Sequence, residues 1–259
     1  MGWSNLNKLS KIKLFCIPYA GGSATVYTKW HKYLHRDIEL YPIELAGRGK
    51  RYAAPFYTSL FEAVDDLFKS IKNDLNGSYA LFGHSMGCWL TLELAYKLNE
   101  LGYNAPRHIF FSGNRPPHIY REEKVLHELS DKEFKDEIFK VGGTPRELFQ
   151  NKELLEFFLP VLRADYKIVE TYCAKNCDMF LNCDISVLNG TEDDLTETEI
   201  EGWKKYTKLQ CNVYNLNGGH FFINEQVHEV ARLINYILIE SSQLGLGCEH
   251  FKHQRQIKV

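Results

Sequence analysis

The chain has 259 residues, of which 25% are charged and 44% are apolar, a composition that is ordinary for a folded protein and argues against intrinsic disorder. This length allows one large α/β domain or two small ones, and either can bury a substantial core. A formal net charge of -2 provides no global electrostatic attraction, so neither nucleic acid nor an anionic membrane is expected as a partner.

Short apolar runs typical of strands alternate along the chain with longer segments of helical periodicity. The predicted strands are residues 12–19, 38–45, 79–83, 107–113, 184–190 and 211–217, and the predicted helices are residues 23–35, 58–75, 86–101, 196–206 and 225–240. Ser23 or Thr25 is expected to cap the first of these helices. The alternation predicts an α/β fold with a mostly parallel sheet and helices on both faces. The nearly continuous apolar strands agree, because parallel strands are buried on both sides.

One stretch, residues 114–182, breaks this alternation and contains several amphipathic helical pieces. A helix-breaking turn at Asn114-Arg-Pro-Pro117 opens it, and Ser130 with Glu133 forms a capping-box pattern inside it. An insertion after the carboxyl end of a parallel strand lies over the ligand crevice, so a lid is expected; a helical subdomain that only adds core is the alternative. The expected division is an α/β core of residues 1–113 and 183–242, a helical lid of residues 114–182, and a flexible tail of residues 243–259.

Seven cysteines, an odd number, are scattered through a chain whose first residues lack the apolar region of a secretory signal. This pattern favours a reducing cytoplasm. No run of 18 apolar residues exists, so no membrane span is expected. Cys173, Cys177 and Cys183 are close enough to suggest zinc, but their spacing departs from the usual zinc patterns, so free thiols and no metal are expected.

The pentapeptide Gly83-His84-Ser85-Met86-Gly87 matches the pattern G-x-S-x-G between a predicted strand and a predicted helix. A sharp turn from strand to helix strains its central residue and requires small residues two positions before and two positions after it. Both glycines meet this requirement. Ser85 is therefore predicted to be a nucleophile, and a purely structural serine at the turn is the alternative.

A serine nucleophile needs a general base within hydrogen-bond reach and a carboxylate that orients the base. In this type of fold the acid and then the base follow the serine along the chain, on loops after later strands. His220 directly follows the strand 211–217, whereas His228 lies inside a predicted helix. His220 is therefore the predicted base.

The loop after the strand 184–190 offers three acids, Glu192, Asp193 and Asp194. Strand-end geometry alone does not separate them, and an acidic turn that caps the helix from Thr196 accounts for at least one. Asp193, three residues after Gly190, is the first choice.

The oxyanion that forms when Ser85 attacks a carbonyl needs preorganised N–H donors. One predicted donor is the backbone N–H of Met86, at the start of the helix that follows the serine. The other is expected from the glycine-containing loop 17–23, where Ala20 or Gly21 could donate. An ordinary glycine turn is the alternative for this loop.

Five segments stand in collinear order between residues 12 and 238: LFCIPYAGGSATVYTKW, IELAGRGKR, LFGHSMGCWLTLELA, LPVLRADYKIVETY and NGGHFFI. Together they resemble the type II thioesterases, the free-standing editing enzymes that accompany nonribosomal peptide synthetases and polyketide synthases. The resemblance implies an α/β-hydrolase fold with a helical lid. It implies hydrolysis of acyl or aminoacyl groups from the phosphopantetheine arm of carrier proteins, with no cofactor of its own. It also implies Ser85 as nucleophile, Asp193 as acid, His220 as base, and Ala20 and Met86 as oxyanion donors.

Two positions depart from the family's pattern. Ala46 stands where a proline is usual before Gly47-Arg48, and Cys88 stands where a small residue often follows the serine motif. Neither belongs to the expected triad, but Cys88 leaves the acyl preference open. Arg163 and Asp165 are expected to form structural polar contacts, or to bind near the arm, rather than to join the triad.

Two other functions fit parts of the pattern. A carboxylesterase or lipase would use the same triad on oxygen esters, and a non-catalytic module of the same fold would lack one member of the triad. All three members are present here, which argues against the module. The expected enzyme is a cytoplasmic monomer whose partners are carrier-protein domains.

Overall fold

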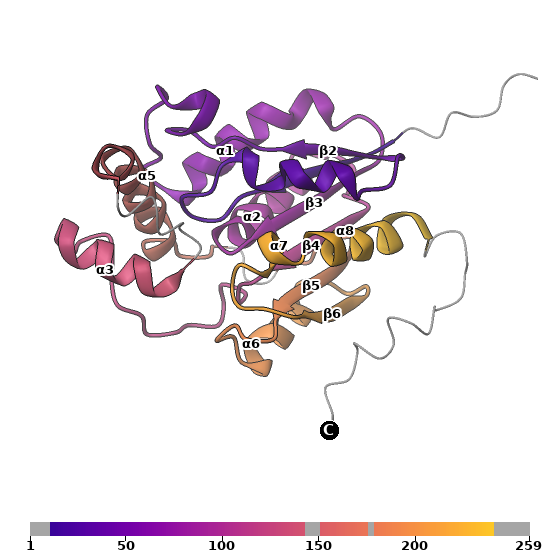
Figure 1. Ribbon diagram of the computed structural model, residues 1–259. Coiled ribbons are helices and arrows are strands. Elements are labelled where there is room, and N and C mark those ends of the chain that lie inside the picture. Colours follow the sequence, from indigo (N-terminus) through magenta and orange to yellow (C-terminus); the bar gives the residue numbers. More distant parts are fainter. Residues whose placement is uncertain (1–10, 143–150, 176–178, 241–259) are drawn as a thin grey trace, which may run out of the picture.

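The computed structural model describes residues 11–142, 151–175 and 179–240, and its centre is a sheet of six strands in which every pairing is parallel (Figure 1). The order across the sheet is β2-β1-β3-β4-β5-β6. This confirms the α/β class, with a sheet that is parallel throughout. The strands are β1 (Ile12–Ile17), β2 (Ile38–Pro42), β3 (Tyr79–His84), β4 (His108–Ser112), β5 (Asp184–Gly190) and β6 (Cys211–Leu216).

The strand order reverses at β1, which has β2 on one side and β3 on the other. Loops at the carboxyl ends of the two strands beside such a reversal diverge, and the crevice between them is where ligands bind in open α/β sheets. Ile17, the last residue of β1, pairs with Gly83 of β3. The loop after β1 and the turn after β3 therefore start next to each other.

Successive side chains of each strand point to opposite faces of the sheet and build two separate layers of core. Leu81 and Phe111 face the layer under α1 (Leu60–Ile71) and α2 (Met86–Glu100), whereas Phe82 packs against helices η1 (Ala24–Lys32) and α8 (Val227–Asn235) on the other face. Rings fill both layers: Trp203 stacks on Phe111 with centroids 3.9 Å apart. Figure 1 shows α8 in front of the sheet and α1 and α2 behind it.

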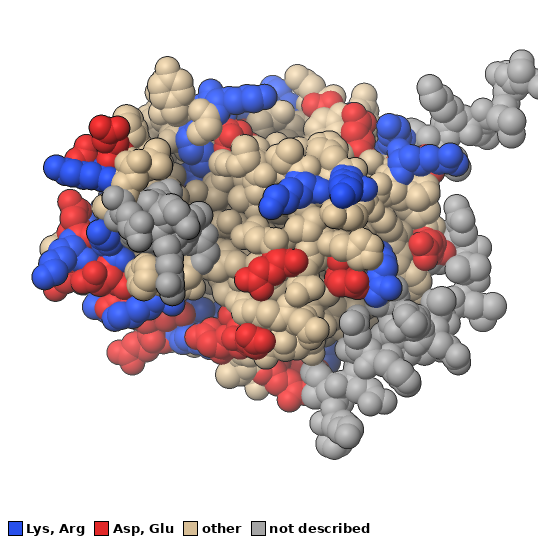
Figure 2. Space-filling view, viewed as in Figure 1, with Lys and Arg blue, Asp and Glu red and all other residues tan. Residues whose placement is uncertain are grey.

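Two helices from the predicted insertion, α3 (Asp131–Val141) and α5 (Lys152–Glu170), lie beyond the carboxyl ends of the strands (Figure 1, left). The predicted capping box of Ser130 and Glu133 is present at the start of α3. The two helices share a small apolar cluster built on Phe134, Ile138 and Leu162, against which Ala20 packs. On the face that Figure 2 shows, basic and acidic side chains are interleaved at this end of the molecule.

Some predicted elements differ from the observed ones in extent or type. Within the segment 23–35, only residues 24–32 are helical and form the 3₁₀ helix η1; its cap is Ser23, whose Oγ accepts a hydrogen bond from the Thr25 N–H. The predicted strand 38–45 ends at Pro42, although the N–H of Ile43 still donates to the Cys16 carbonyl. The predicted helix 225–240 is divided because Gln226 leaves helical geometry, with φ -100 and ψ 36. The remaining elements are η2 (Gly49–Arg51), η3 (Lys72–Asp74), α6 (Glu197–Glu201), η4 (Gly202–Tyr206), α7 (Phe222–Glu225) and η5 (Tyr236–Glu240).

One of the amphipathic helical pieces predicted within the insertion, residues 144–150, lies outside the described residues, as does the predicted tail, residues 243–259. In the part of the chain that the structure describes, no helix combines the length and the apolar character needed to cross a bilayer.

Candidate active site

Ser85 stands at the sharp turn between β3 and α2, with φ 54 and ψ -119. It is the only non-glycine residue with positive φ among those that the structure describes. Such a backbone costs about 1–3 kcal/mol and persists only where the surroundings enforce it. Here the Ser85 N–H donates to the Ser112 carbonyl at 2.8 Å, and the Ser85 carbonyl accepts from the Asn114 side chain at 2.9 Å and from the Cys88 N–H at 2.8 Å.

The two glycines of the motif are required by close backbone approach. A Cβ on Gly83 would lie 2.1 Å from the Gly87 carbonyl oxygen, so any side chain there would drive β3 and α2 apart. A Cβ on Gly87 would lie 2.4 Å from the Ile17 carbonyl oxygen. The start of α2 therefore packs directly on the end of β1, which brings the turn and the loop 17–23 together.

Cys88 has a structural role beneath this turn. Its side chain is fully buried, and its Sγ lies 3.3 Å from the Gly83 carbonyl oxygen and 3.2 Å from the Ser112 carbonyl oxygen; Sγ also accepts from the Ser112 N–H at 3.2 Å. Burial raises the pKa of the Cys88 thiol well above its usual range, so the group stays a neutral thiol. Cys88 thus ties α2 to β3 and β4.

The structure brings Asp193 and His220 together: Asp193 Oδ2 lies 2.9 Å from His220 Nδ1. The Asp193 side chain is 5% exposed, whereas the Asp194 side chain is 81% exposed and pairs with Arg121 at 3.0 Å. A buried carboxylate on Nδ1 fixes the imidazole tautomer and leaves Nε2 as the basic nitrogen. This geometry separates the candidate acids and favours Asp193.

Backbone contacts hold the two loops that carry this pair. The Glu192 N–H donates to the Gly218 carbonyl at 2.9 Å, and the Asp193 N–H donates to the Gly190 carbonyl at 3.1 Å. A Cβ on Gly190 would lie 2.4 Å from the Gly219 carbonyl oxygen. Gly190 therefore permits the close approach of the loop after β5 to the loop that leads into His220.

A second histidine, His84, lies beside His220, with ring centroids 5.2 Å apart. Its Nδ1 shares a 2.9 Å hydrogen bond with Ser112 Oγ, and its side chain is fully buried. Burial, followed by the charge of His220, holds the pKa of His84 well below its usual range. His84 therefore stays neutral and is a poor proton acceptor, while His220 has its own carboxylate and partial contact with solvent.

Ser85 follows His84 in the chain, and the His84 ring lies beside His220. The Ser85 hydroxyl nevertheless makes no hydrogen bond to His220 or to any other residue that the structure describes. Hydrogen bonds of this kind often tighten only when substrate binds. The unliganded site thus contains the paired acid and base and the strained serine, without the final serine–histidine hydrogen bond.

The sequence left Ala20 and Gly21, both in the loop after β1, open as backbone N–H donors to the oxyanion. Only one of these two N–H groups is available in the structure. The Gly21 N–H already donates to Asp165 Oδ2 at 2.7 Å. Within the described residues, the N–H groups of Ala20 and Met86 make no hydrogen bond. Of the donors that the sequence predicts, the backbone N–H groups of Ala20 and Met86 therefore remain free to bind an oxyanion.

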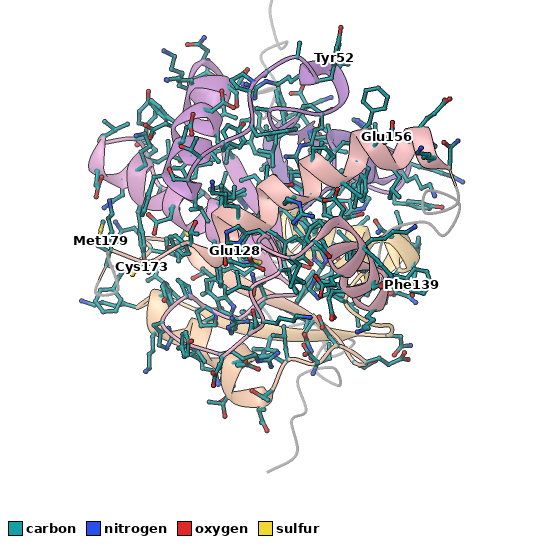
Figure 3. All side chains as sticks on the ribbon, turned by 90° about the vertical axis from the view of Figure 1, so that its left-hand side faces the viewer. Tyr52, Glu128, Phe139, Glu156, Cys173 and Met179 are labelled. Atoms are coloured by element: carbon teal, nitrogen blue, oxygen red, sulfur yellow. The ribbon has the colours of Figure 1, made fainter. Side chains whose placement is uncertain are left out.

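A cavity of about 320 Å³ separates the loop after β1 from the two helices of the insertion. Figure 3, viewed from the side of α3 and α5, shows α5 crossing this end of the molecule, with Phe139 on α3 beside it. The cavity reaches the donor residue Ala20 and Phe221, the neighbour of His220, and none of the described residues that line it carries a charge. Its lining residues are Tyr19, Ala20, Gly21, Gly22, Ser23, Thr25, Val26, Ile138, Val141, Gly142, Phe158, Leu162, Tyr166 and Phe221.

The sequence predicts structural polar contacts, or binding near the arm, for Asp165, and it predicts no partner for Arg48. In the structure they form a buried ion pair with two N–O contacts, of 2.6 and 2.7 Å. The two residues are 117 positions apart in the chain. The sequence marks them only through the two segments that contain them, IELAGRGKR and LPVLRADYKIVETY. Among the candidate zinc ligands, Cys183 is buried and Cys173 is exposed, and Cys177 lies outside the described residues.

The chain is similar to known proteins both in sequence and in structure. The thioesterase domain family matches residues 12–238. A protein of Brevibacillus parabrevis named linear gramicidin dehydrogenase LgrE is 36% identical over 234 residues, 88% of each chain. The crystal structure of ClbQ from the colibactin NRPS/PKS pathway superposes with a TM-score of 0.87 at 37% identity, covering 92% of this chain and 100% of that one. The type II thioesterase BorB from the borrelidin biosynthetic cluster superposes with a TM-score of 0.80 at 30% identity, covering 88% of this chain and 93% of that one.

Proposed function

The chain belongs to the thioesterase family, and we propose that it hydrolyses acyl or aminoacyl thioesters on the phosphopantetheine arm of carrier proteins, as a type II thioesterase that clears aberrant groups from nonribosomal peptide or polyketide synthases. The observation that carries this proposal is the Asp193–His220 pair, 2.9 Å apart, beside a strained Ser85 at the carboxyl edge of a parallel sheet. Two similar structures support the choice of substrate: ClbQ is named as a protein of an NRPS/PKS pathway, and BorB is named as a type II thioesterase.

In the proposed mechanism, His220 Nε2 takes the proton of Ser85 as Oγ attacks the thioester carbonyl. The N–H groups of Ala20 and Met86 stabilise the oxyanion of the tetrahedral intermediate, and Asp193 stabilises the imidazolium. The carbon–sulfur bond then breaks, and His220 returns the proton to the departing pantetheine thiolate. A water molecule, deprotonated by His220, attacks the acyl-serine ester in the same way and releases the carboxylic acid.

The helices α3 and α5 act as a lid in this proposal, and the cavity beneath them receives the acyl group. The lining residues that the structure describes carry no charge, which favours neutral acyl groups, because burying an unpaired charge is costly. The carrier protein docks near this end and supplies the phosphopantetheine arm, so the enzyme needs no cofactor of its own. The enzyme works as a monomer in the cytoplasm, and the free thiols of the five described cysteines suit a reducing compartment.

Two other activities are suggested, one by the name of a relative and one by the candidate triad. The name of the relative LgrE specifies a dehydrogenase, but this chain contains no G-x-G-x-x-G segment of the kind that binds dinucleotides after a strand. A carboxylesterase would use the same site on oxygen esters.

The test compares kcat/KM for an acyl carrier protein with kcat/KM for a p-nitrophenyl ester of matched acyl length. We expect the carrier thioester to be preferred, because binding energy from the carrier and the arm is available only to that substrate. A preference for the free oxygen ester would instead identify an esterase. A panel of acetyl, aminoacyl and longer acyl groups on peptidyl and acyl carrier proteins then defines the preferred substrate.

A further inference from the structure

The loop that carries the Ala20 N–H is tied to α5 by a buried ion pair. The side chains of Arg48 and Asp165 are 6% and 2% exposed. Arg48 Nη1 and Nη2 donate to the two carboxylate oxygens at 2.6 and 2.7 Å, and Oδ2 also accepts from the Gly21 N–H at 2.7 Å. Arg48 Nη1 further donates to the Gly22 carbonyl at 3.1 Å. Two consecutive residues of the loop are thus held by the pair.

These contacts determine where the Ala20 N–H points. The Tyr19 carbonyl and the Ala20 N–H belong to one planar trans peptide, so they point in opposite directions. The Tyr19 carbonyl accepts from the Gly22 N–H at 2.8 Å, which turns the Ala20 N–H away from the inside of the turn. Gly21, with φ +75, allows this turn, and its N–H is fixed by Asp165. The orientation of the Ala20 donor therefore depends on the two residues that follow it.

The positive charge of Arg48 offsets the negative charge of Asp165 near the oxyanion donor. A bare carboxylate one peptide away from a forming oxyanion would oppose the negative charge of the intermediate. The bidentate guanidinium neutralises Asp165, so the carboxylate can hold the Gly21 N–H without that penalty. Asp165 and Arg48 together thus hold the loop at Gly21 rigidly while carrying no net charge.

We propose that Asp165 and Arg48 are positioning residues of the reaction, which orient the oxyanion donor Ala20 through the Gly21 N–H and the Gly22 carbonyl. This inference rests on the proposed function, in which Ala20 supplies one of the two oxyanion donors. Because Asp165 lies on α5, the oxyanion loop and the lid helix are coupled. Phe158 and Leu162 of α5 add to this coupling, since they lie within 3.2 Å of the position of a Cβ on Gly21.

The test uses Asp165→Asn, which keeps an acceptor for the Gly21 N–H but not the paired carboxylate oxygens. We expect kcat for an acyl carrier protein to fall about ten- to hundredfold with KM within about twofold, because a misplaced donor weakens transition-state binding only. The matched control is Asp131→Asn, which breaks an exposed ion pair between Arg163 of α5 and the start of α3. The control should keep the wild-type kcat.

Two inhibitors separate positioning from a general loss of structure. A trifluoromethyl ketone with the acyl chain accepts Ser85 Oγ at its carbonyl carbon; the proton passes to His220 and the new oxyanion occupies the donor site. Asp165→Asn should weaken this inhibitor by about the factor lost in kcat, and should leave the affinity of a thioether analogue, which forms no oxyanion, unchanged. Equal loss for both inhibitors, or wild-type affinity for the ketone, would overturn the inference.

A second variant covers the case in which Asp165→Asn does not fold. Replacing the pair together, Arg48→Met with Asp165→Leu, removes both buried charges and leaves no unpaired ion, so the fold is expected to persist. This double variant should show the same split between the two inhibitors, and an unchanged ketone affinity would count against the inference. If the wild type binds the ketone but cleaves no carrier thioester, the proposed function fails while this comparison still decides the role of Asp165.

Discussion

Asp193 and Asp194 are adjacent carboxylates on one loop, and exchanging each for asparagine is a sharp test of the candidate triad. Asp193 lies 2.9 Å from His220 Nδ1 and is buried, so Asp193→Asn keeps the shape of the site and permits the wrong imidazole tautomer. In serine proteases the equivalent change lowers kcat by about 10⁴, which corresponds to about 5.5 kcal/mol in the activation free energy. We expect a loss of 10³- to 10⁴-fold, a range of about 4 to 5.5 kcal/mol.

The assay is single-turnover release of a radiolabelled acyl group from a carrier protein, followed at neutral pH. Asp194→Asn is the matched control, because its side chain is 81% exposed and its only described side-chain partner is Arg121, which also pairs with Glu199. The control should stay within about twofold of the wild type, since exposed ion pairs contribute about 0–1 kcal/mol. A large loss in the control, or more than a tenth of wild-type activity in Asp193→Asn, would refute the geometric argument.

Three further predictions concern packing, pH and acyl length. Gly87→Ala places a Cβ 2.4 Å from the Ile17 carbonyl oxygen, so chemical denaturation should show a loss of about 1–3 kcal/mol in the free energy of unfolding, and kcat should fall as the loop moves. His108 is buried, and burial lowers its pKa to about 4. The unfolded chain therefore binds the extra proton between about pH 4 and pH 6.5, and this residue should cost up to about 3 kcal/mol of stability as the pH falls through that window. Phe158→Trp should narrow the cavity and lower kcat/KM for octanoyl relative to acetyl thioesters, by about fourfold for each methylene that no longer fits.

Controls distinguish these effects from general damage. Gly102→Ala also changes a glycine, but nothing lies within 4 Å of its Cβ, so activity should be unchanged despite a backbone cost of about 1–2 kcal/mol from its positive φ. For the pH effect, His108→Leu with Ser186→Ala removes the ionisable ring and its 2.8 Å hydrogen-bond partner. Urea unfolding of that variant should depend less on pH between 4 and 6.5; an unchanged slope would contradict the assignment to His108.

The sheet and the turn at Ser85 could be predicted because local sequence determines them. Residues 184–190 were predicted as a strand and form β5 with the same bounds. The G-x-S-x-G pattern predicted the strained turn, since both of its glycines are needed where β3, α2 and β1 meet. By contrast, the break at Gln226 in the last helix has no proline or glycine to mark it.

The sequence left open those features that depend on contacts between distant segments. Asp193 and Asp194 are equivalent as neighbours on a loop, and the structure separates them by their partners: Asp193 pairs with His220, 27 residues away, and Asp194 with Arg121, 73 residues away. The contact between Asp165 and Arg48 likewise joins α5 to the loop after β2, over 117 residues. Such pairings follow from the packed fold and not from any local pattern.

The proposed role of Ser85 is to cleave thioesters on a carrier protein, and intact-protein mass spectrometry of a loaded carrier measures that cleavage. Wild-type protein should convert the acyl-phosphopantetheine form to the free thiol form with catalytic turnover. Ser85→Ala should leave the carrier to unload only at the rate of spontaneous hydrolysis, because alanine has no hydroxyl to attack the thioester carbonyl. Equal unloading by Ser85→Ala and the wild type, or no unloading by the wild type on any loaded carrier, would contradict this role.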